Sequence, residues 1–89
     1  MYKIILEKPV IKFLEKHKWE KLIEQFENSL ILLSNDPYDN QLDIKIINWL
    51  PNSYRIRIWK YRFLYEIIEE IISISFFWAW PRGDVYKNI

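Results

Sequence analysis

Three arginines, Arg55, Arg57 and Arg62, lie close together in a segment where apolar and polar residues alternate. From Ile44 to Tyr65 the chain carries five basic residues and no acidic one, so this segment has a local positive field although the net charge is only +1. Guanidinium groups donate hydrogen bonds in a fixed fork that suits the oxygens of a phosphate. These residues therefore indicate binding of a phosphodiester, and a solvated, solubilising face is the alternative.

The alternation predicts three strands in a meander, starting at Tyr54, Tyr61 and Ile72. We expect Trp59-Lys60 and Glu69-Glu70 to be two-residue turns, which fixes the pairing of the strands. The expected pairs are Ile58 with Tyr61, Ile56 with Phe63 and Tyr54 with Tyr65, then Tyr65 with Ile74, Phe63 with Phe76 and Tyr61 with Trp78. This register collects the large apolar side chains on one face, where helices can cover them.

The same register places Arg57 directly opposite Arg62 on the other face. Like charges opposite each other destabilise a sheet, so an anion between them is expected. Glu66 lies on this face as well, and its neutralisation of Arg55 on a diagonal is the competing explanation.

The segment before the meander predicts a first strand from Tyr2 to Leu6 and two helices. Pro9 fits the first position of a helix, and the apolar spacing is interrupted near His17–Lys18, which predicts two antiparallel helices. The stretch 35–40 has turn chemistry and closes the second helix. The expected fold class is α+β, in the order β-α-α-β-β-β, with two N-terminal helices packed on an antiparallel sheet.

Composition narrows the function classes. The chain has 89 residues, no cysteine and one histidine, which predicts a single domain over residues 1–89 and excludes a disulfide framework and clustered zinc sites. The longest nearly apolar run, Ile71 to Trp80, is far below the roughly 20 residues of a membrane span. Because the start resembles no secretion signal, we expect a cytoplasmic protein with no membrane partner.

Two motifs resemble the RelE/ParE toxin superfamily. The run Tyr54-Arg-Ile-Arg-Ile-Trp-Lys-Tyr-Arg-Phe-Leu-Tyr-Glu-Ile67 is similar to the signature Y-R-I-R-(I/V)-G-D-Y-R-(V/I)-(I/L)-Y-E-(I/V). The run Pro81-Arg-Gly-Asp-Val-Tyr-Lys87 resembles the closing (H/P)-R-x-x-(V/A)-Y segment of the RelE branch, particularly its archaeal members. The motifs occur in the family's order, and the early strand, the helix pair and the meander match its length and elements.

This resemblance implies a toxin of a type II toxin–antitoxin system that cuts messenger RNA in the ribosomal A site, without metal or cofactor. It implies attack of the RNA 2′-hydroxyl on the adjacent phosphate. Arg55 and Arg57 match the two basic residues of the first meander strand, and Arg62 matches the arginine that stabilises the phosphorane. Arg82 matches a terminal arginine that contacts the leaving group or phosphate, and Tyr86 matches a tyrosine that stacks on a base. The further RNA-binding residues expected are Lys45, Trp59, Lys60 and Lys87.

The sequence departs from the family at two points. Arginine does not readily accept a proton, so Arg55 and Arg57 are poor general bases where some relatives have lysines, and Glu66 is a candidate base by geometry only. Trp59-Lys60 stands where the signature has Gly-Asp, so Trp59 either stacks on a nucleotide or covers the sheet edge. The other tryptophans considered, Trp49, Trp78 and Trp80, are expected in the core, and His17 is expected on the surface or at a helix cap.

The expected partners are the ribosome, messenger RNA and a cognate antitoxin with acidic, helix-forming segments. A ParE-type inhibitor of DNA gyrase is one alternative, and an inactive relative that keeps antitoxin binding is another. Arg82 and Tyr86 favour the ribonuclease, because ParE relatives usually lack both residues.

Overall fold

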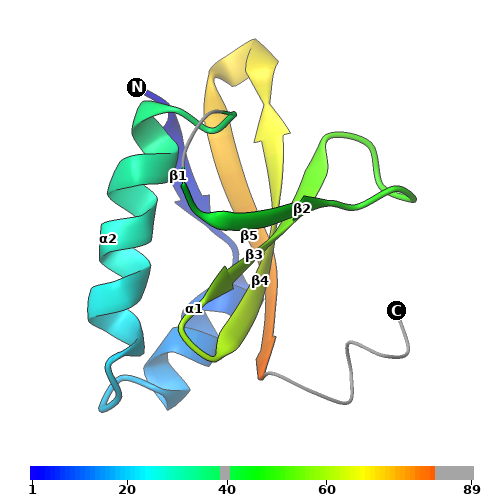
Figure 1. The fold of residues 1–89 in the computed structure, drawn as a ribbon. Helices are drawn as coiled ribbons and strands as arrows, with labels where there is room; N and C mark the ends of the chain where they lie inside the picture. Colours follow the sequence, from blue (N-terminus) through cyan, green and yellow to red (C-terminus); the bar gives the residue numbers. More distant parts are fainter. Residues whose placement is uncertain (39–40, 82–89) are drawn as a thin grey trace.

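The alternating segments of the sequence form a five-stranded sheet that two helices cover on one face (Figure 1). The computed structural model describes residues 1–38 and 41–81. The elements in chain order are β1 (Lys3–Leu6), α1 (Lys8–Lys16), α2 (Leu22–Asn35), β2 (Asp43–Ile46), β3 (Ser53–Ile58), β4 (Tyr61–Ile68), the 3₁₀ turn η1 (Glu69–Ile71) and β5 (Ser73–Pro81). The predicted α+β class is confirmed.

The strand order is β1-β5-β4-β3-β2, with β1 parallel to β5 and the other neighbours antiparallel. The sheet is therefore mixed, and β2 is an additional strand that the sequence analysis did not predict. The hairpin of β3 and β4 has the predicted register: Ile56 pairs with Phe63, and Arg57 pairs with Arg62.

Both helices end where the sequence signals predict, and α1 begins at Lys8, one residue before the predicted first position. Pro9 lies in the first turn of α1, where its missing N–H costs no helical hydrogen bond. The helix ends at Lys16, and the N–H of the C-cap residue His17 donates to the carbonyls of Phe13 and Leu14. The second helix ends at Asn35, just before Asp36 and Pro37. No helix within the two described ranges has both the length and the apolar character that crossing a lipid bilayer requires.

One cluster of buried side chains joins the helices to the inner face of the sheet. The fully buried members include Val10, Leu22 and Leu33 from the helices and Ile56, Phe63, Tyr65, Ile74 and Phe76 from the strands. The Phe63 ring lies at the centre, with its centroid 4.8 Å from that of Phe26 and 6.3 Å from that of Phe76. Truncation of such a residue to alanine typically costs about 3–5 kcal/mol, so this cluster fixes the sheet that carries the charged face.

The predicted register of the second hairpin is wrong. The connection is not a Glu69-Glu70 turn but η1 followed by Ile72 in the left-handed region, with φ 47°. The register is further interrupted by a bulge, because β5 has the extra residue Phe77 opposite the step from Leu64 to Tyr65. Ile74 therefore pairs with Ile67 and Phe76 pairs with Tyr65. Tyr61 pairs with Pro81 and Phe63 with Ala79, not with Trp78 and Phe76.

The bulge changes the face of the sheet on which two tryptophans lie. Trp78 pairs with Leu64 and Trp80 pairs with Arg62, so both indoles share the outer face with the arginines. The prediction that Trp78 and Trp49 belong to the core is wrong, because the bulge turns Trp78 to the outer face and Trp49 lies in the β2–β3 loop, whereas Trp80 is buried as predicted. Trp78 is 45% exposed, Trp49 is 60% exposed, and Trp80 is buried on the face opposite the helices.

Candidate nucleic-acid interface

Four basic residues come from three neighbouring strands on the outer face: Lys45, Arg55, Arg57 and Arg62, here called the arginine face. Arg57 and Arg62 are directly opposite each other, as the sequence predicts, and Lys45 is directly opposite Arg55. Side chains at such positions lie about 5 Å apart at Cβ. The sheet therefore concentrates positive charge at this end of its outer face.

Arg55 is the most enclosed cation of the arginine face, with 7% of its side chain exposed. Its Nη1 lies 3.5 Å from both the carboxylate Oδ1 and the carbonyl oxygen of Asp43. Its Nε is buried and makes no hydrogen bond within the described residues. A buried donor without a partner is costly, so Arg55 is poised to bind an additional acceptor.

Asp43 is an acidic neighbour that sequence reasoning missed. It directly precedes the acid-free segment and enters the sheet only because β2 forms, where it pairs with Arg57 across the ladder. No ion pair between Glu66 and Arg55 is found among the described residues, and Asp43 takes the place expected for Glu66. The Asp-Ile-Lys-Ile alternation was the available signal for this strand.

Arg57 and Arg62 differ in exposure. Arg57 is exposed, and its Nε donates a hydrogen bond to the Trp59 carbonyl at 3.3 Å. Arg62 is half-buried, and its cross-strand neighbour on β5 is Trp80. One guanidinium of the pair is thus open to solvent while the other is packed into the face.

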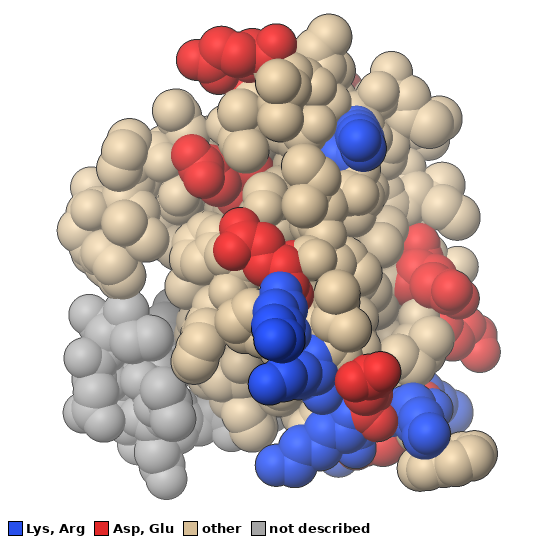
Figure 2. Space-filling model, turned by 180° about the vertical axis from the view of Figure 1, so that it is seen from behind, with Lys and Arg blue, Asp and Glu red and all other residues tan. Residues whose placement is uncertain are grey.

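A second group of cations lies on α1. Lys8, Lys12 and Lys16, here called the lysine band, are spaced four residues apart and are all exposed. Figure 2 shows basic side chains gathered over the part of the molecule where α1 lies, with acidic side chains beside them. Residues at this spacing share one face of a helix, so the lysine band is a solvated stripe apart from the sheet.

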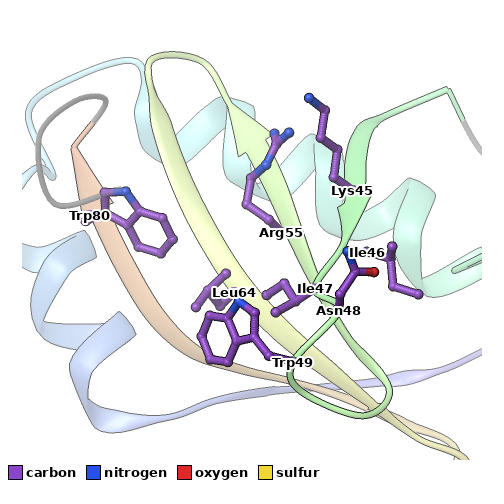
Figure 3. Close-up of a pocket in the computed structure, with 8 residues that line it drawn as sticks. All are labelled: Lys45, Ile46, Ile47, Asn48, Trp49, Arg55, Leu64 and Trp80. Atoms are coloured by element: carbon purple, nitrogen blue, oxygen red, sulfur yellow. The ribbon is translucent and has the colours of Figure 1, made fainter. Parts of the chain in front are cut away.

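A groove opens on the outer face beside Arg55, with a volume of about 190 Å³. It is called the indole groove here, because Trp80 of β5 and Trp49 of the β2–β3 loop both line it (Figure 3). Figure 3 shows the two indoles close to Leu64, and the side chains of Arg55 and Lys45 extending side by side. The other lining residues are Ile46, Ile47 and Asn48. The expected RNA-binding residue Lys45 therefore reaches this groove.

The β3–β4 turn holds Trp59 and Lys60, two further expected RNA-binding residues, away from the indole groove. Trp59 has φ 59°, and its ring packs edge-on against Tyr61 with centroids 5.7 Å apart. The Lys60 Nζ lies 4.7 Å from the Trp59 ring centroid and 3.9 Å from a Glu20 carboxylate oxygen. Both side chains are thus engaged with the end of the sheet nearest the helices.

Tyr61, Glu20 and His17 form a hydrogen-bonded cluster beside this turn. The Tyr61 hydroxyl donates to Glu20 Oε1 at 2.5 Å and lies 3.2 Å from His17 Nδ1, and that nitrogen is 2.7 Å from Glu20 Oε2. The bond from Tyr61 holds the pKa of Glu20 below its usual value, and His17 adds to the effect. Burial, with the bond to Glu20, raises the pKa of Tyr61 to about 12. His17 lies at the helix cap that the sequence predicts and ties α1 to the sheet.

Glu66 lies too far along β4 to assist the paired arginines. It is four residues from Arg62, about 13 Å along a strand, and its cross-strand neighbours are Ser53 and Ser75. It lines a separate hollow together with Glu7. The geometric argument for Glu66 as a general base therefore fails. Within residues 1–38 and 41–81, no three acidic or histidine side chains gather in a way that could hold a metal ion.

Three expected site residues, Arg82, Tyr86 and Lys87, lie outside the described residues. The described part of the site consists of the arginine face, Asp43 and the indole groove. This arrangement can bind an anion at the guanidinium groups and a flat apolar group in the indole groove.

Several solved structures are similar to this fold, although neither a family model nor a curated protein matches the sequence. A chain of the archaeal RelE–RelB complex from Pyrococcus horikoshii has a TM-score of 0.78 and 22% identity, over 92% of this chain and 96% of that chain. A chain of the RelB–RelE antitoxin–toxin complex from Methanococcus jannaschii has a TM-score of 0.74 and 26% identity, over 96% and 98%. The isolated E. coli RelE toxin has a TM-score of 0.70 and 20% identity, over 99% and 94%. The chain has the fold of the RelE toxins.

Proposed function

We propose that this protein is a RelE-like toxin that acts in the cytoplasm as a ribosome-dependent endoribonuclease. The fold supports the toxin class, since similar structures include RelE toxins alone and with antitoxins. The single observation that carries the proposal is the pairing of Arg57 with Arg62 on the outer face, two residues from the enclosed Arg55.

In the proposed reaction, the 2′-hydroxyl of one nucleotide attacks the next phosphate. A cyclic phosphate forms, and the 5′-hydroxyl leaves. Arg57 and Arg62 bind the phosphate from two sides and stabilise the negative charge that develops on its oxygens, and fixed donors of this kind are usually the largest catalytic contribution. Guanidinium groups have no acceptor atom, so the proton of the 2′-hydroxyl passes to a phosphate oxygen or to water, and the departing 5′-oxygen takes up a proton from the same phosphate oxygen or water as its bond to phosphorus breaks. The leaving group is proposed to contact Arg82, and a base is proposed to stack on Tyr86.

The test is in vitro translation of a defined message followed by primer extension. We expect wild-type protein to cut at codons in the ribosomal A site only during translation, and Arg62→Ala to reduce cutting by about 10²–10³-fold, as for removal of a transition-state donor. Lys3→Ala is the matched control, because Lys3 is an exposed cation on the opposite edge strand. Unaffected messages and unaffected protein synthesis with wild-type protein would contradict the proposal, and a supercoiling assay would then test action on gyrase.

The proposed partner is an antitoxin whose apolar, helix-forming segment covers the helices while its acidic residues face the arginines. Ile11 of α1 and Ile31 and Leu32 of α2 are between 43% and 61% exposed. Ile31 and Ile11 each line a shallow, mostly apolar hollow that also includes residues of β1. We expect the toxin alone to be monomeric or weakly dimeric, and a tight dimer in sedimentation would contradict this expectation.

A further inference from the structure

We infer that the indole groove binds one unstacked base of the RNA strand, with Trp49 as the stacking platform, and that it thereby holds the adjoining phosphate beside the Arg57–Arg62 pair. This inference rests on the proposed function and assigns a binding role to Trp49 and Trp80. The sequence pattern predicts core positions for both residues.

The size and lining of the groove favour a single base. Its volume of about 190 Å³ is below the roughly 300–1,000 Å³ of typical small-molecule pockets. The apolar surface comes from Leu64 and the two indoles, and Figure 3 shows Leu64 between Trp80 and Trp49. Bases of single strands stack on aromatic side chains irrespective of their identity, since every base has a π face.

The charges beside the groove suit the phosphate of the same nucleotide. Arg55 and Lys45 line the groove, and the Arg55 Nε is a buried donor without a partner in the described residues. Arg55 is also two residues from Arg57, about 7 Å along the strand. A strand whose base occupies the groove therefore passes next to the Arg57–Arg62 pair.

The loop that carries Trp49 is held by backbone hydrogen bonds. The Ile47 N–H donates to the Ser53 carbonyl at 3.0 Å, and the Ser53 hydroxyl donates to the Pro51 carbonyl at 3.1 Å. Trp49 is nevertheless 60% exposed. A loop whose backbone is held in place before binding loses little backbone freedom when a base stacks on its side chain. The loop thus presents Trp49 to a ligand, while Trp80 is already packed.

The test is binding of a short single-stranded RNA whose 2′-hydroxyls are methylated so that it cannot be cut, measured by fluorescence anisotropy. We expect Trp49→Ala to weaken binding about 5- to 150-fold, as for loss of one base–aromatic stack. Trp19→Ala is the matched control, because Trp19 is 89% exposed in the connection between the helices. Its effect should stay below about twofold. An abasic strand of the same length should bind wild type and Trp49→Ala alike.

Each alternative result overturns the inference. Equal effects of Trp49→Ala and Trp19→Ala would show that no base stacks on Trp49. An equal loss with the abasic strand would assign Trp49 to the structure of the loop, and no binding by wild-type protein would exclude the subsite. The cleavage assay separates this inference from the proposed function. If Trp49-dependent binding occurs without cleavage, only the ribonuclease proposal fails; if cleavage occurs without such binding, only the subsite fails.

Discussion

The arginine face and the lysine band both concentrate positive charge, but the protein holds the two sets of cations differently. Arg55 is enclosed and lies beside a carboxylate, while the lysines of α1 are exposed and mutually repulsive. Guanidinium groups fixed by a sheet offer directed hydrogen bonds, whereas ammonium groups on flexible stems act mainly as screened point charges. The difference indicates that the arginine face forms a binding site of defined geometry, whereas the lysine band mainly keeps the protein soluble.

Exchange of the two kinds of cation tests this distinction most strongly. We expect Arg55→Lys to reduce RNA binding and cleavage about 10–100-fold, because an ammonium cannot replace the fork of Arg55 and hydrogen bonds to charged groups contribute about 1.5–3 kcal/mol. Lys12→Arg on α1 should leave both unchanged. Oligonucleotide binding and primer extension measure the effects, and urea unfolding checks that each variant folds. If Arg55→Lys left RNA binding and cleavage unchanged, the positive charge of this residue would matter and the geometry of its guanidinium group would not.

A smaller effect is expected from a change in the hydrogen-bonded cluster of Tyr61, Glu20 and His17, and it concerns stability. We expect Tyr61→Phe to lower the free energy of unfolding by about 0.5–1.5 kcal/mol near pH 7, because it removes the hydroxyl bonded to Glu20. The folded-state pKa of Tyr61 is raised to about 12, so its contribution is complete below pH 10 and is lost as the pH rises toward 12. The lowered pKa of Glu20 acts in the opposite direction, since its contribution is lost as the pH falls below 4.5.

Urea unfolding of wild-type and Tyr61→Phe protein across this pH range measures both effects. The difference between the two proteins should shrink above pH 10. A difference that stayed constant up to pH 12 would contradict this titration of Tyr61, and equal stability of the two proteins near pH 7 would show that the Tyr61 hydroxyl does not stabilise the fold through Glu20.

The smallest effect is expected from the lysine band. Simultaneous replacement of Lys8, Lys12 and Lys16 by glutamine removes two like-charge pairs at i, i+4 spacing, which should raise stability by about 0.4–1 kcal/mol. Affinity for the methylated RNA and its dependence on salt should change little. The measurement is the slope of log K against log salt. A slope shallower by about 0.7 for each lysine would show that the lysine band contacts the phosphates of the RNA. The arginine face and the lysine band would then not differ in function.

The sequence predicted the parts of the fold that follow from local patterns. Pro9, the break near His17 and the turn after Asn35 located the helices, and strict alternation located the β3–β4 hairpin with its paired arginines. The strand β2 was missed because it has four residues and lies at the sheet edge, so few apolar positions mark it.

The groove could not be predicted for a different reason. The run Ile72 to Trp80 is apolar almost throughout, so nothing in its pattern marks Phe77 as an extra residue. Without the bulge, simple alternation assigns Trp78 and Trp80 to the core. The position of Trp49 also depends on β2, because that strand fixes where the following loop begins.

The bulge at Phe77 also divides β5 into a first half that packs in the core and a second half whose large side chains lie on the outer face. Before it, β5 contributes Ile74 and Phe76 to the core; after it, only the small or compact residues Ala79 and Pro81 face inward. Trp78, which is 45% exposed, can therefore be exchanged without repacking the interior, whereas the buried Trp80 cannot. In evolution or design, the outer face is adjustable at Trp78 while the fold is maintained by residues that precede the bulge.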